Sequence, residues 1–204
     1  MALHRELNSN AFVGFIESVP AYSSLAVFYD LLIVSKQKKN TQMSFDFVKE
    51  VIERLIAQVE LNPTTEADRL VEVPVWYGGE DLEMISALHH LSVDEVISLH
   101  TSVECRVYMI GFLPGFAYMG TVDERIAAPR RKSPRTVVPS GSVGIAGLQT
   151  GIYPTASPGG WQLIGRTPKK VFDKTKNNPC LFQPGDRVRF YSIDQNEFNK
   201  RNEY

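Results

Sequence analysis

Basic side chains gather in a part of the sequence that lacks carboxylates. No aspartate or glutamate occurs between Arg125 and Phe172, whereas arginines stand at positions 130, 135 and 166. The planar guanidinium group of arginine can hold a carboxylate or a phosphate through two parallel hydrogen bonds. The sequence therefore allows an anion-binding site in this stretch, with a solvated basic face as the alternative.

Aromatic side chains stand beside glycines and prolines in the same region. Tyr118, Tyr153 and Trp161 each carry a polar atom that needs a hydrogen-bond partner when it is buried. Rings held on tight turns can line a concave binding surface. We therefore predict that these three residues line a cavity, with packing in the core as the alternative, and we expect Phe112 and Phe116 to be structural.

One histidine has a position that suits acid–base chemistry. His100 follows a helix predicted to begin near Ser92, and a histidine ordinarily titrates near neutral pH. We consider it a candidate general base, against the alternative of a satisfied packing residue. Ser142 and Ser157 could donate hydrogen bonds, but turn formation is the simpler role for both.

The familiar motifs of self-contained enzymes are absent from the sequence. There is no GxxxxGK phosphate loop, no GxSxG elbow and no HExxH helix, and residues 141–147 lack the dinucleotide-binding spacing. Cys105 and Cys180 lie far apart and outside any CxxC pair. His89 and His90 are adjacent, and adjacent helical positions do not face one another. Neither a metal site nor a disulfide is predicted.

Composition limits the partners and the location that we expect. The 204 residues carry 22 basic and 23 acidic side chains, a formal charge of -1, so no net field draws the chain toward nucleic acid or an anionic membrane. The basic stretch also lacks the arginine-rich helix or aromatic-interleaved strand of nucleic-acid binders. No apolar run reaches the roughly 18 residues that span a bilayer, and no signal peptide is recognised. We expect a cytoplasmic protein.

Two architectures that would position these groups share the chain. Only three of the 14 glycines and three of the 12 prolines precede Gly111, so the turns crowd into the later part of the sequence. In the earlier part, apolar residues recur every three or four positions at 48–59, which predicts a helix. Strands are predicted at 15–19, 25–34 and 71–75. We place the domain boundary at Gly78-Gly79.

The later part is predicted to open with two short helices and to continue as strands. Ser92 and Glu95 have the spacing of a capping box, which marks the start of the second helix. Many short strands separated by glycine and proline turns indicate a β-barrel or a sandwich. These strands are predicted around 103–109, 136–138, 143–146, 161–164 and 187–191.

A series of motifs in the later part resembles one protein family. It begins with Gly-Phe-Leu-Pro-Gly-Phe-Ala-Tyr-Met-Gly at 111–120, and further runs follow at 128–130, 138–147, 149–154, 157–161 and 164–167. The chain is similar to the B subunit family of bacterial ATP-dependent 5-oxoprolinases. That family is also called allophanate hydrolase subunit 1 or sporulation kinase inhibitor, and it resembles half of the carboxyltransferase domain of urea carboxylase. The motif positions are Gly111, Phe112, Pro114, Gly115, Phe116, Pro139, Gly141, Ser142, Gly147, Gln149, Pro154, Ser157, Pro158, Gly159, Gly160 and Thr167.

The resemblance implies a fold for each part of the chain. It implies a ferredoxin-like α+β domain over residues 1–78 and a mainly β, cyclophilin-like barrel over residues 79–204. Family members usually begin with a strand containing a Gly-Asp-Ser-Ala-Leu-like motif, and this sequence starts at what resembles the end of the next helix, at 2–7. We therefore expect the first domain to lack one strand, so that an upstream segment or another chain would cover the free edge.

The resemblance also implies a function shared with two partners, the A and C subunits. Together they open the lactam ring of 5-oxoproline to give glutamate while hydrolysing ATP, which we expect a partner or a shared interface to bind. One alternative is a binding module that inhibits a sporulation-type histidine kinase. Another is a carboxyltransferase component of the allophanate hydrolase or urea carboxylase type. Peptidyl-prolyl isomerase activity rests on fold analogy alone.

Matched motifs favour particular site residues. Arg130 and Arg166 lie within them, which favours the binding interpretation over a solvated basic face for both. We predict that these two arginines, with Arg135, converge on an aromatic mouth and hold a carboxylate or a phosphate. His100 fits a family position, which is the second reason to consider it catalytic.

Overall fold

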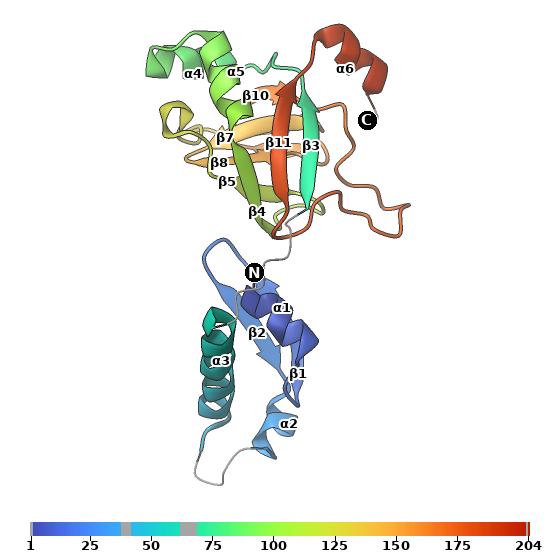
Figure 1. The fold of residues 1–204 in the computed structure, drawn as a ribbon. Coiled ribbons are helices and arrows are strands. Elements are labelled where there is room, and N and C mark those ends of the chain that lie inside the picture. The colour runs from blue at the N-terminus through green and yellow to red at the C-terminus, as the bar shows by residue number, and fades with distance from the viewer. Residues whose placement is uncertain (1, 38–41, 62–68, 203) are drawn as a thin grey trace. The chain divides into compact units, whose positions relative to one another are not determined.

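The computed structural model describes residues 2–37, 42–61, 69–202 and 204 (Figure 1). The chain divides into two compact units, Met1–Ala67 and Asp68–Tyr204. The structure thus places the division at 67/68 and not after residue 78, because the strand that follows position 69 pairs within the second unit.

The first unit contains three helices and one antiparallel pair of strands among its described residues. The pair is joined by a tight turn in which the backbone amide of Ala21 donates to the carbonyl of Ser24 at 2.8 Å. Strand 70–75, which the expected ferredoxin-like domain over residues 1–78 would include, lies in the other unit. The elements are α1 (Ala2–Ser9), β1 (Phe15–Pro20), β2 (Leu25–Tyr29), α2 (Leu31–Ser35) and α3 (Ser44–Leu61).

The strand predicted over 25–34 is wrong in its second half. β2 ends at Tyr29, and the Asp30 carboxylate then accepts hydrogen bonds from the backbone amides of Leu32 and Ile33 at 2.8 and 2.9 Å. An aspartate in this N-cap position satisfies amides that have no partner inside a helix. The apolar, β-branched run after Asp30 therefore forms α2 in spite of its strand-like composition.

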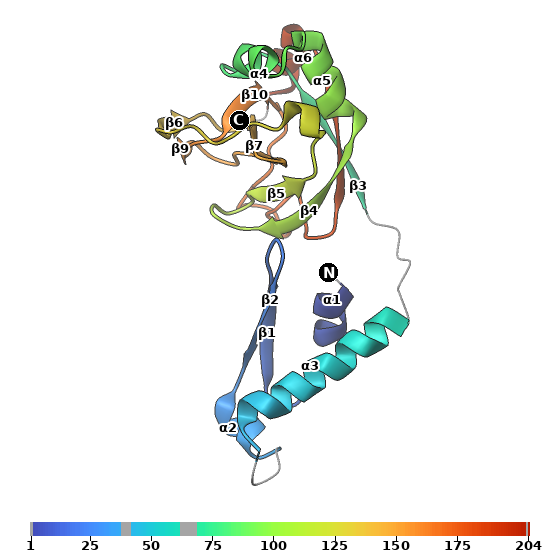
Figure 2. The same cartoon turned by 90° about the vertical axis from the view of Figure 1, so that its left-hand side faces the viewer.

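The second unit is built on one strongly curled sheet with two helices packed at one end (Figures 1 and 2). Its strands run in the order β10-β7-β8-β5-β4-β11-β3, and β6 and β9 form a separate pair. The elements are β3 (Leu70–Val75), α4 (Leu82–His89), α5 (Val93–Ser102), β4 (Glu104–Ile110), β5 (Ala117–Gly120), η1 (Glu124–Ile126), β6 (Arg135–Val138), β7 (Ser142–Ala146), β8 (Gln149–Ile152), β9 (Ser157–Gly159), β10 (Gln162–Arg166), β11 (Arg187–Ser192) and α6 (Gln195–Arg201).

The two outer strands of this sheet meet at one corner. Trp76, directly after β3, and Arg166, at the end of β10, exchange two backbone hydrogen bonds of 2.9 Å. At this corner the sheet therefore closes on itself as a barrel does, and part of each edge is paired. β3 and β11 are parallel neighbours, although they come from opposite ends of the unit's sequence.

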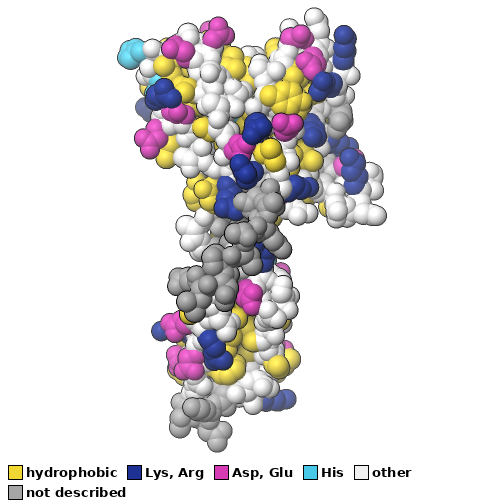
Figure 3. All heavy atoms as spheres, viewed as in Figure 1, with side chains coloured by type: hydrophobic (Ala, Val, Ile, Leu, Met, Phe, Trp, Pro, Cys, Tyr) yellow, Lys and Arg dark blue, Asp and Glu magenta, His cyan; other side chains and the backbone are white. Residues whose placement is uncertain are grey.

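Two groups of apolar side chains fill the second unit. The larger core joins the sheet to the helices, and Val73 of β3, Ile85 of α4 and Val96 of α5 are fully buried in it. The smaller group is aromatic and lies around Phe116. Among residues 2–37, 42–61, 69–202 and 204, no helix has both the length and the apolar character that crossing a membrane requires. On the face that Figure 3 shows, basic and acidic side chains lie interspersed.

Candidate functional site

A cavity of about 390 Å³ lies against the smaller, aromatic group. The loop between β4 and β5, the loop before β6, and β9 with the turn to β10 surround it, and β5 and the loop after β8 each add one tyrosine. Its volume falls within the range of roughly 300–1,000 Å³ that is typical of small-molecule sites. It is lined by Phe112, Leu113, Phe116, Tyr118, Arg130, Pro134, Tyr153, Ser157, Pro158, Gly159, Gly160 and Trp161.

Phe116 is the centre of the aromatic wall. Its ring centroid lies 4.9 Å from that of Tyr118, 5.3 Å from Tyr153 and 5.5 Å from Trp161, all in edge-on contacts. Such contacts stabilise aromatic clusters beyond the burial of their surface. Phe112 adds a further edge-on contact and is 63% exposed, at a φ of 70°. Both phenylalanines thus line the cavity together with the tyrosines and the tryptophan, whereas we had expected Phe112 and Phe116 to be only structural.

A glycine lets the backbone come close to a buried tyrosine in the cavity. A Cβ atom at Gly159 would lie 2.4 Å from the Tyr153 hydroxyl oxygen, so any side chain there would displace the ring. Burial raises the pKa of Tyr153, and a hydrogen bond from the backbone of Trp161 and the charge of Arg130 oppose that rise in part. The hydroxyl therefore stays protonated and can act as a donor near neutral pH.

Arg130 is the cation at the cavity. The centre of its guanidinium group lies 5.8 Å from the Trp161 ring centroid, within the range of a cation–π contact. Among the described residues, no carboxylate pairs with it and no hydrogen bond engages its side chain. The guanidinium group is thus open to a ligand on the side that does not face the ring.

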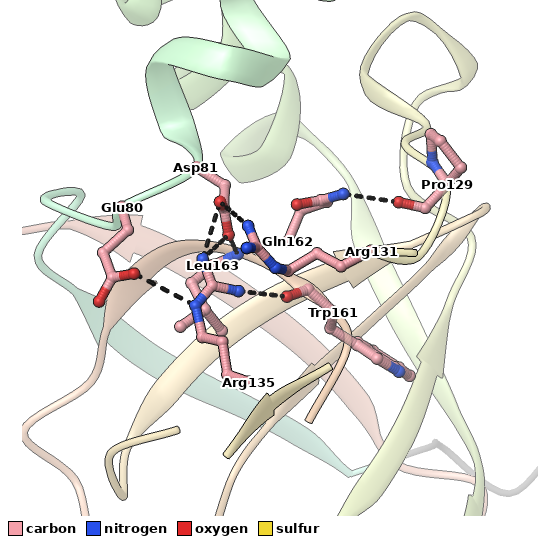
Figure 4. Close-up of polar contacts among 8 residues, drawn as sticks. All are labelled: Glu80, Asp81, Pro129, Arg131, Arg135, Trp161, Gln162 and Leu163. Carbon is pink, nitrogen blue, oxygen red and sulfur yellow. Dashed lines mark hydrogen bonds and ion pairs between the residues drawn. The ribbon is translucent and has the colours of Figure 1, made fainter. Parts of the chain in front are cut away.

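Arg135 has an internal partner. Its guanidinium donates to both carboxylate oxygens of Asp81, at 2.8 and 2.7 Å, and to the backbone carbonyl of Trp161 at 3.3 Å (Figure 4). A third donor contacts the exposed carboxylate of Glu80 at 3.1 Å. Only 12% of the Arg135 side chain and 7% of the Asp81 side chain are exposed. The structure makes Arg135 part of the scaffold behind Trp161, in contrast to the ligand contact that we predicted.

Asp81 connects several segments around the cavity. Besides Arg135, it accepts hydrogen bonds from Arg131 at 3.2 Å and from the backbone amide of Leu163 at 2.6 Å. It precedes α4, but its side chain makes no capping hydrogen bond to that helix. The carboxylate therefore fastens the start of α4 to β10 and to the loop before β6.

Arg166 lies outside the cavity. It donates to the backbone carbonyl of Ser140 at 2.9 Å, and its guanidinium centre lies 5.4 Å from the Phe198 ring. Its Nε atom is buried and has no hydrogen-bond partner among the described residues. The expected convergence of Arg130, Arg135 and Arg166 on one anion is therefore absent, because only Arg130 lines the cavity.

His100 is a buried core residue that does not line the cavity. Its Nδ1 lies 2.7 Å from the Tyr77 hydroxyl and its Nε2 lies 3.1 Å from Thr150 Oγ1, which in turn donates to the carbonyl of Gly144. Since Thr150 donates onward, Nε2 is assigned as the donor and Nδ1 as the acceptor, so both ring nitrogens are satisfied in the neutral form. Burial lowers the pKa of His100 to about 3. The structure thus favours the packing interpretation over a general base.

This burial predicts that acid destabilises the second unit. The folded chain holds His100 neutral down to about pH 3, whereas in the unfolded chain it takes up a proton below its ordinary pKa of 6.5. Between these values the unfolded state binds more protons, so stability falls as the pH falls, by at most about 1.4 kcal/mol per pH unit from this residue. Urea unfolding followed by tryptophan fluorescence from about pH 7 to pH 5 measures the slope, because both tryptophans lie in this unit.

The matched comparison uses two histidine variants. His100→Gln should show a shallower loss of stability with falling pH than the wild type, whereas His90→Asn, at an exposed position of φ 54°, should not change the slope. Equal slopes for the wild type and His100→Gln would contradict the assignment of a neutral buried imidazole.

Some of the other motif residues lie at or beside the cavity, and the rest lie elsewhere in the second unit, at what we call frame positions. The loop residues Gly111, Pro114 and Gly115 flank the lining phenylalanines. Ser142 is buried in β7 and Ser157 at the cavity in β9. Frame positions away from the lining are Pro139, Gly141, Gly147, Gln149, Pro154 and Thr167. No group of histidine, cysteine, aspartate or glutamate among the described residues is arranged to hold a metal ion.

Sequence reasoning missed Asp81, Arg131, Leu113 and Pro134. Arginines in an acid-free stretch need a carboxylate from elsewhere if they are buried, but nothing in the sequence singles out Asp81 among the other acids. Leu113 and Pro134 carry no polar group, and only the course of their loops brings them to the cavity.

Comparison with known families gives the class of this chain. Residues 1–182 match the profile described as carboxyltransferase domain, subdomain C and D. The chain therefore belongs to that family of carboxyltransferase domains.

Two known proteins and one solved structure are similar to this chain. The chain is 46% identical to the 5-oxoprolinase B subunit of Bacillus subtilis over 95% of this chain and 82% of that protein. It is 36% identical to the urea amidolyase of Saccharomyces cerevisiae, over 60% of this chain and 7% of that protein. The crystal structure of TTHA0988 superposes with a TM-score of 0.77 at 37% identity, covering 95% of this chain and 36% of the longer one.

Proposed function

We propose that this chain is one component of an ATP-dependent 5-oxoprolinase that converts 5-oxo-L-proline to L-glutamate. The observation that carries the proposal is the 46% identity to a 5-oxoprolinase B subunit along nearly the whole chain. In the reaction, the carbon–nitrogen bond of the lactam breaks. Water supplies the hydroxyl group to the carbonyl carbon and the proton to the nitrogen.

The proposal includes the A and C subunits as partners, and a location. ATP would bind to one of these partners or at a shared interface, because the sequence has no phosphate-binding loop. Free Cys105 and Cys180 suit a reducing cytoplasm. For the fold, we propose an incomplete ferredoxin-like arrangement of the first unit and a cyclophilin-like barrel for the second, in which the Trp76–Arg166 bridge is the supporting feature.

The test of this proposal is reconstitution from separate subunits. Mixing the chain with A and C subunits from the same genome should give a complex that releases glutamate only when ATP and all three proteins are present. Each protein is omitted in turn as the control. Glutamate release by the A and C subunits alone at the full rate, or failure of this chain to co-purify with them, would count against the assignment.

A carboxyltransferase role is the second candidate. It is supported by the similarity to urea amidolyase and by the family profile. Carboxylation of urea in the reconstituted complex, without release of glutamate, would favour it. A sporulation-type histidine kinase stays an alternative partner, for which the exposed apolar side chains Ile16, Phe28 and Leu32 of the first unit offer a surface to test.

A further inference from the structure

We propose that the aromatic cavity binds a small carboxylate that carries a flat, amide-containing ring. Arg130 would hold the carboxylate, and the rings around Phe116 would contact the flat part of the ligand. 5-Oxoproline has this chemistry, so the inference rests on the proposed function and adds where, and by which groups, the ligand is held.

The charge of the cavity supports an anionic ligand. Arg131 and Arg135 are neighbours of Arg130 in sequence, and both pair with the buried carboxylate of Asp81, while Arg135 also pairs with the carboxylate of Glu80. Arg130 has no such partner among the described residues. A guanidinium group left open beside an apolar wall can bind a carboxylate through two charge-assisted hydrogen bonds.

The walls of the cavity support a flat ring. Phe116, Tyr118 and Trp161 stand edge-on to one another, so they present ring faces and edges at different angles to the same space. A planar amide can lie against such rings without losing hydrogen bonds at its faces. Tyr118 lines the cavity and its hydroxyl has no hydrogen-bond partner among the described residues, so it would donate to the carbonyl oxygen of the ligand.

The backbone on both sides of Arg130 is fastened to the turn that carries Trp161. On one side, the side-chain amide of Gln162 donates to the carbonyl of Pro129 at 2.8 Å, and Gln162 is only 6% exposed (Figure 4). On the other side, the backbone amide of Arg131 donates to the carbonyl of Gly160 at 2.8 Å. The backbone that carries Arg130 is thus fixed next to the Trp161 turn before any ligand arrives, which lowers the entropic cost of ordering this segment on binding.

Direct binding to the full chain tests the inference. In a ligand-detected NMR titration, 5-oxo-L-proline should bind to the wild-type chain saturably. Arg130→Gln should weaken this binding by about ten- to a hundredfold, the loss expected for hydrogen bonds to a charged group. Arg130→Lys should fall between them, because lysine keeps the charge but not the planar fork. 2-Pyrrolidinone, which has the ring without the carboxylate, should bind weakly and be insensitive to Arg130→Gln.

Arg125→Gln is the matched control. Arg125 is exposed, pairs with Asp123 and lies outside the cavity lining, so the same change of charge there should leave the dissociation constant unaltered. Absence of saturable binding to the wild-type chain would overturn the inference, as would equal binding by Arg130→Gln. The reconstituted complex distinguishes the binding site from the proposed function. If Arg130→Gln leaves glutamate release unchanged, the proposed function stands and the cavity is not the binding site.

Discussion

Replacing Asp81 with alanine is expected to destabilise the second unit by about 3–5 kcal/mol. The change would leave the buried guanidinium of Arg135 without its buried carboxylate partner and would leave the Leu163 amide without an acceptor. Breaking a buried ion pair on one side costs much more than removing both partners, because an uncompensated charge remains. Chemical unfolding followed by tryptophan fluorescence measures the loss.

Glu80→Ala is the control for this prediction. Glu80 contacts the same arginine, but 70% of its side chain is exposed, so its removal should cost at most about 1 kcal/mol. The double variant Asp81→Leu with Arg135→Met should recover part of the stability lost in Asp81→Ala, since no charge is then left buried. Similar effects of Asp81→Ala and Glu80→Ala would show that the ion pair is solvated.

Phe116→Ala is expected to cost about 3–5 kcal/mol of unfolding free energy. The Phe116 side chain is 1% exposed and contacts every other ring of the aromatic group, so its loss would join a new void to the existing cavity. Truncation of a buried aromatic residue removes both its transfer free energy and its packing contacts. Equilibrium unfolding in urea measures the change.

Phe112 supplies the matched comparison for Phe116. The two residues have the same side chain and contact each other, but Phe112 is 63% exposed. Phe112→Ala should therefore change stability by about 0.5 kcal/mol or less. A loss for Phe112→Ala as large as that for Phe116→Ala would mean that the exposed ring contributes to packing more than its exposure indicates.

Local signals predicted elements in both units, including the helix at 48–59 in the first, but they missed β5, β8, β9 and α6 in the second. The capping box of Ser92 and Glu95 is present as predicted, because both of its hydrogen bonds involve residues three apart. The strand at 70–75 was also predicted, but its neighbour was not. β3 pairs with β11, which lies more than a hundred residues later, and no local pattern encodes such a partner. The run after Tyr29 was mistaken for strand because the capping effect of Asp30 outweighed composition.

The candidate site divides in the same way. The aromatic residues of the cavity were predicted because their positions beside glycines and prolines are visible in the sequence. The sequence did not show which arginine lines the cavity and which is paired internally. Arg135 differs from Arg130 because it pairs with Asp81, which is distant in sequence. The role of His100 likewise could not be predicted, because its hydrogen-bond partners Tyr77 and Thr150 come from other segments of the chain.

The parallel pairing of β3 with β11 constrains the order of events during synthesis of the chain. Residues 70–75 leave the ribosome long before residues 187–192. β3 can therefore pair with β11 only after residues 187–192 have been synthesised. The bridge between Trp76 and Arg166 also cannot form until the sequence up to Arg166 has been synthesised. Proteins dominated by contacts this distant in sequence fold on timescales of roughly milliseconds to seconds. In the meantime, the apolar strand Leu-Val-Glu-Val-Pro-Val stays exposed on the nascent chain, and its proline and glutamate limit pairing with other chains.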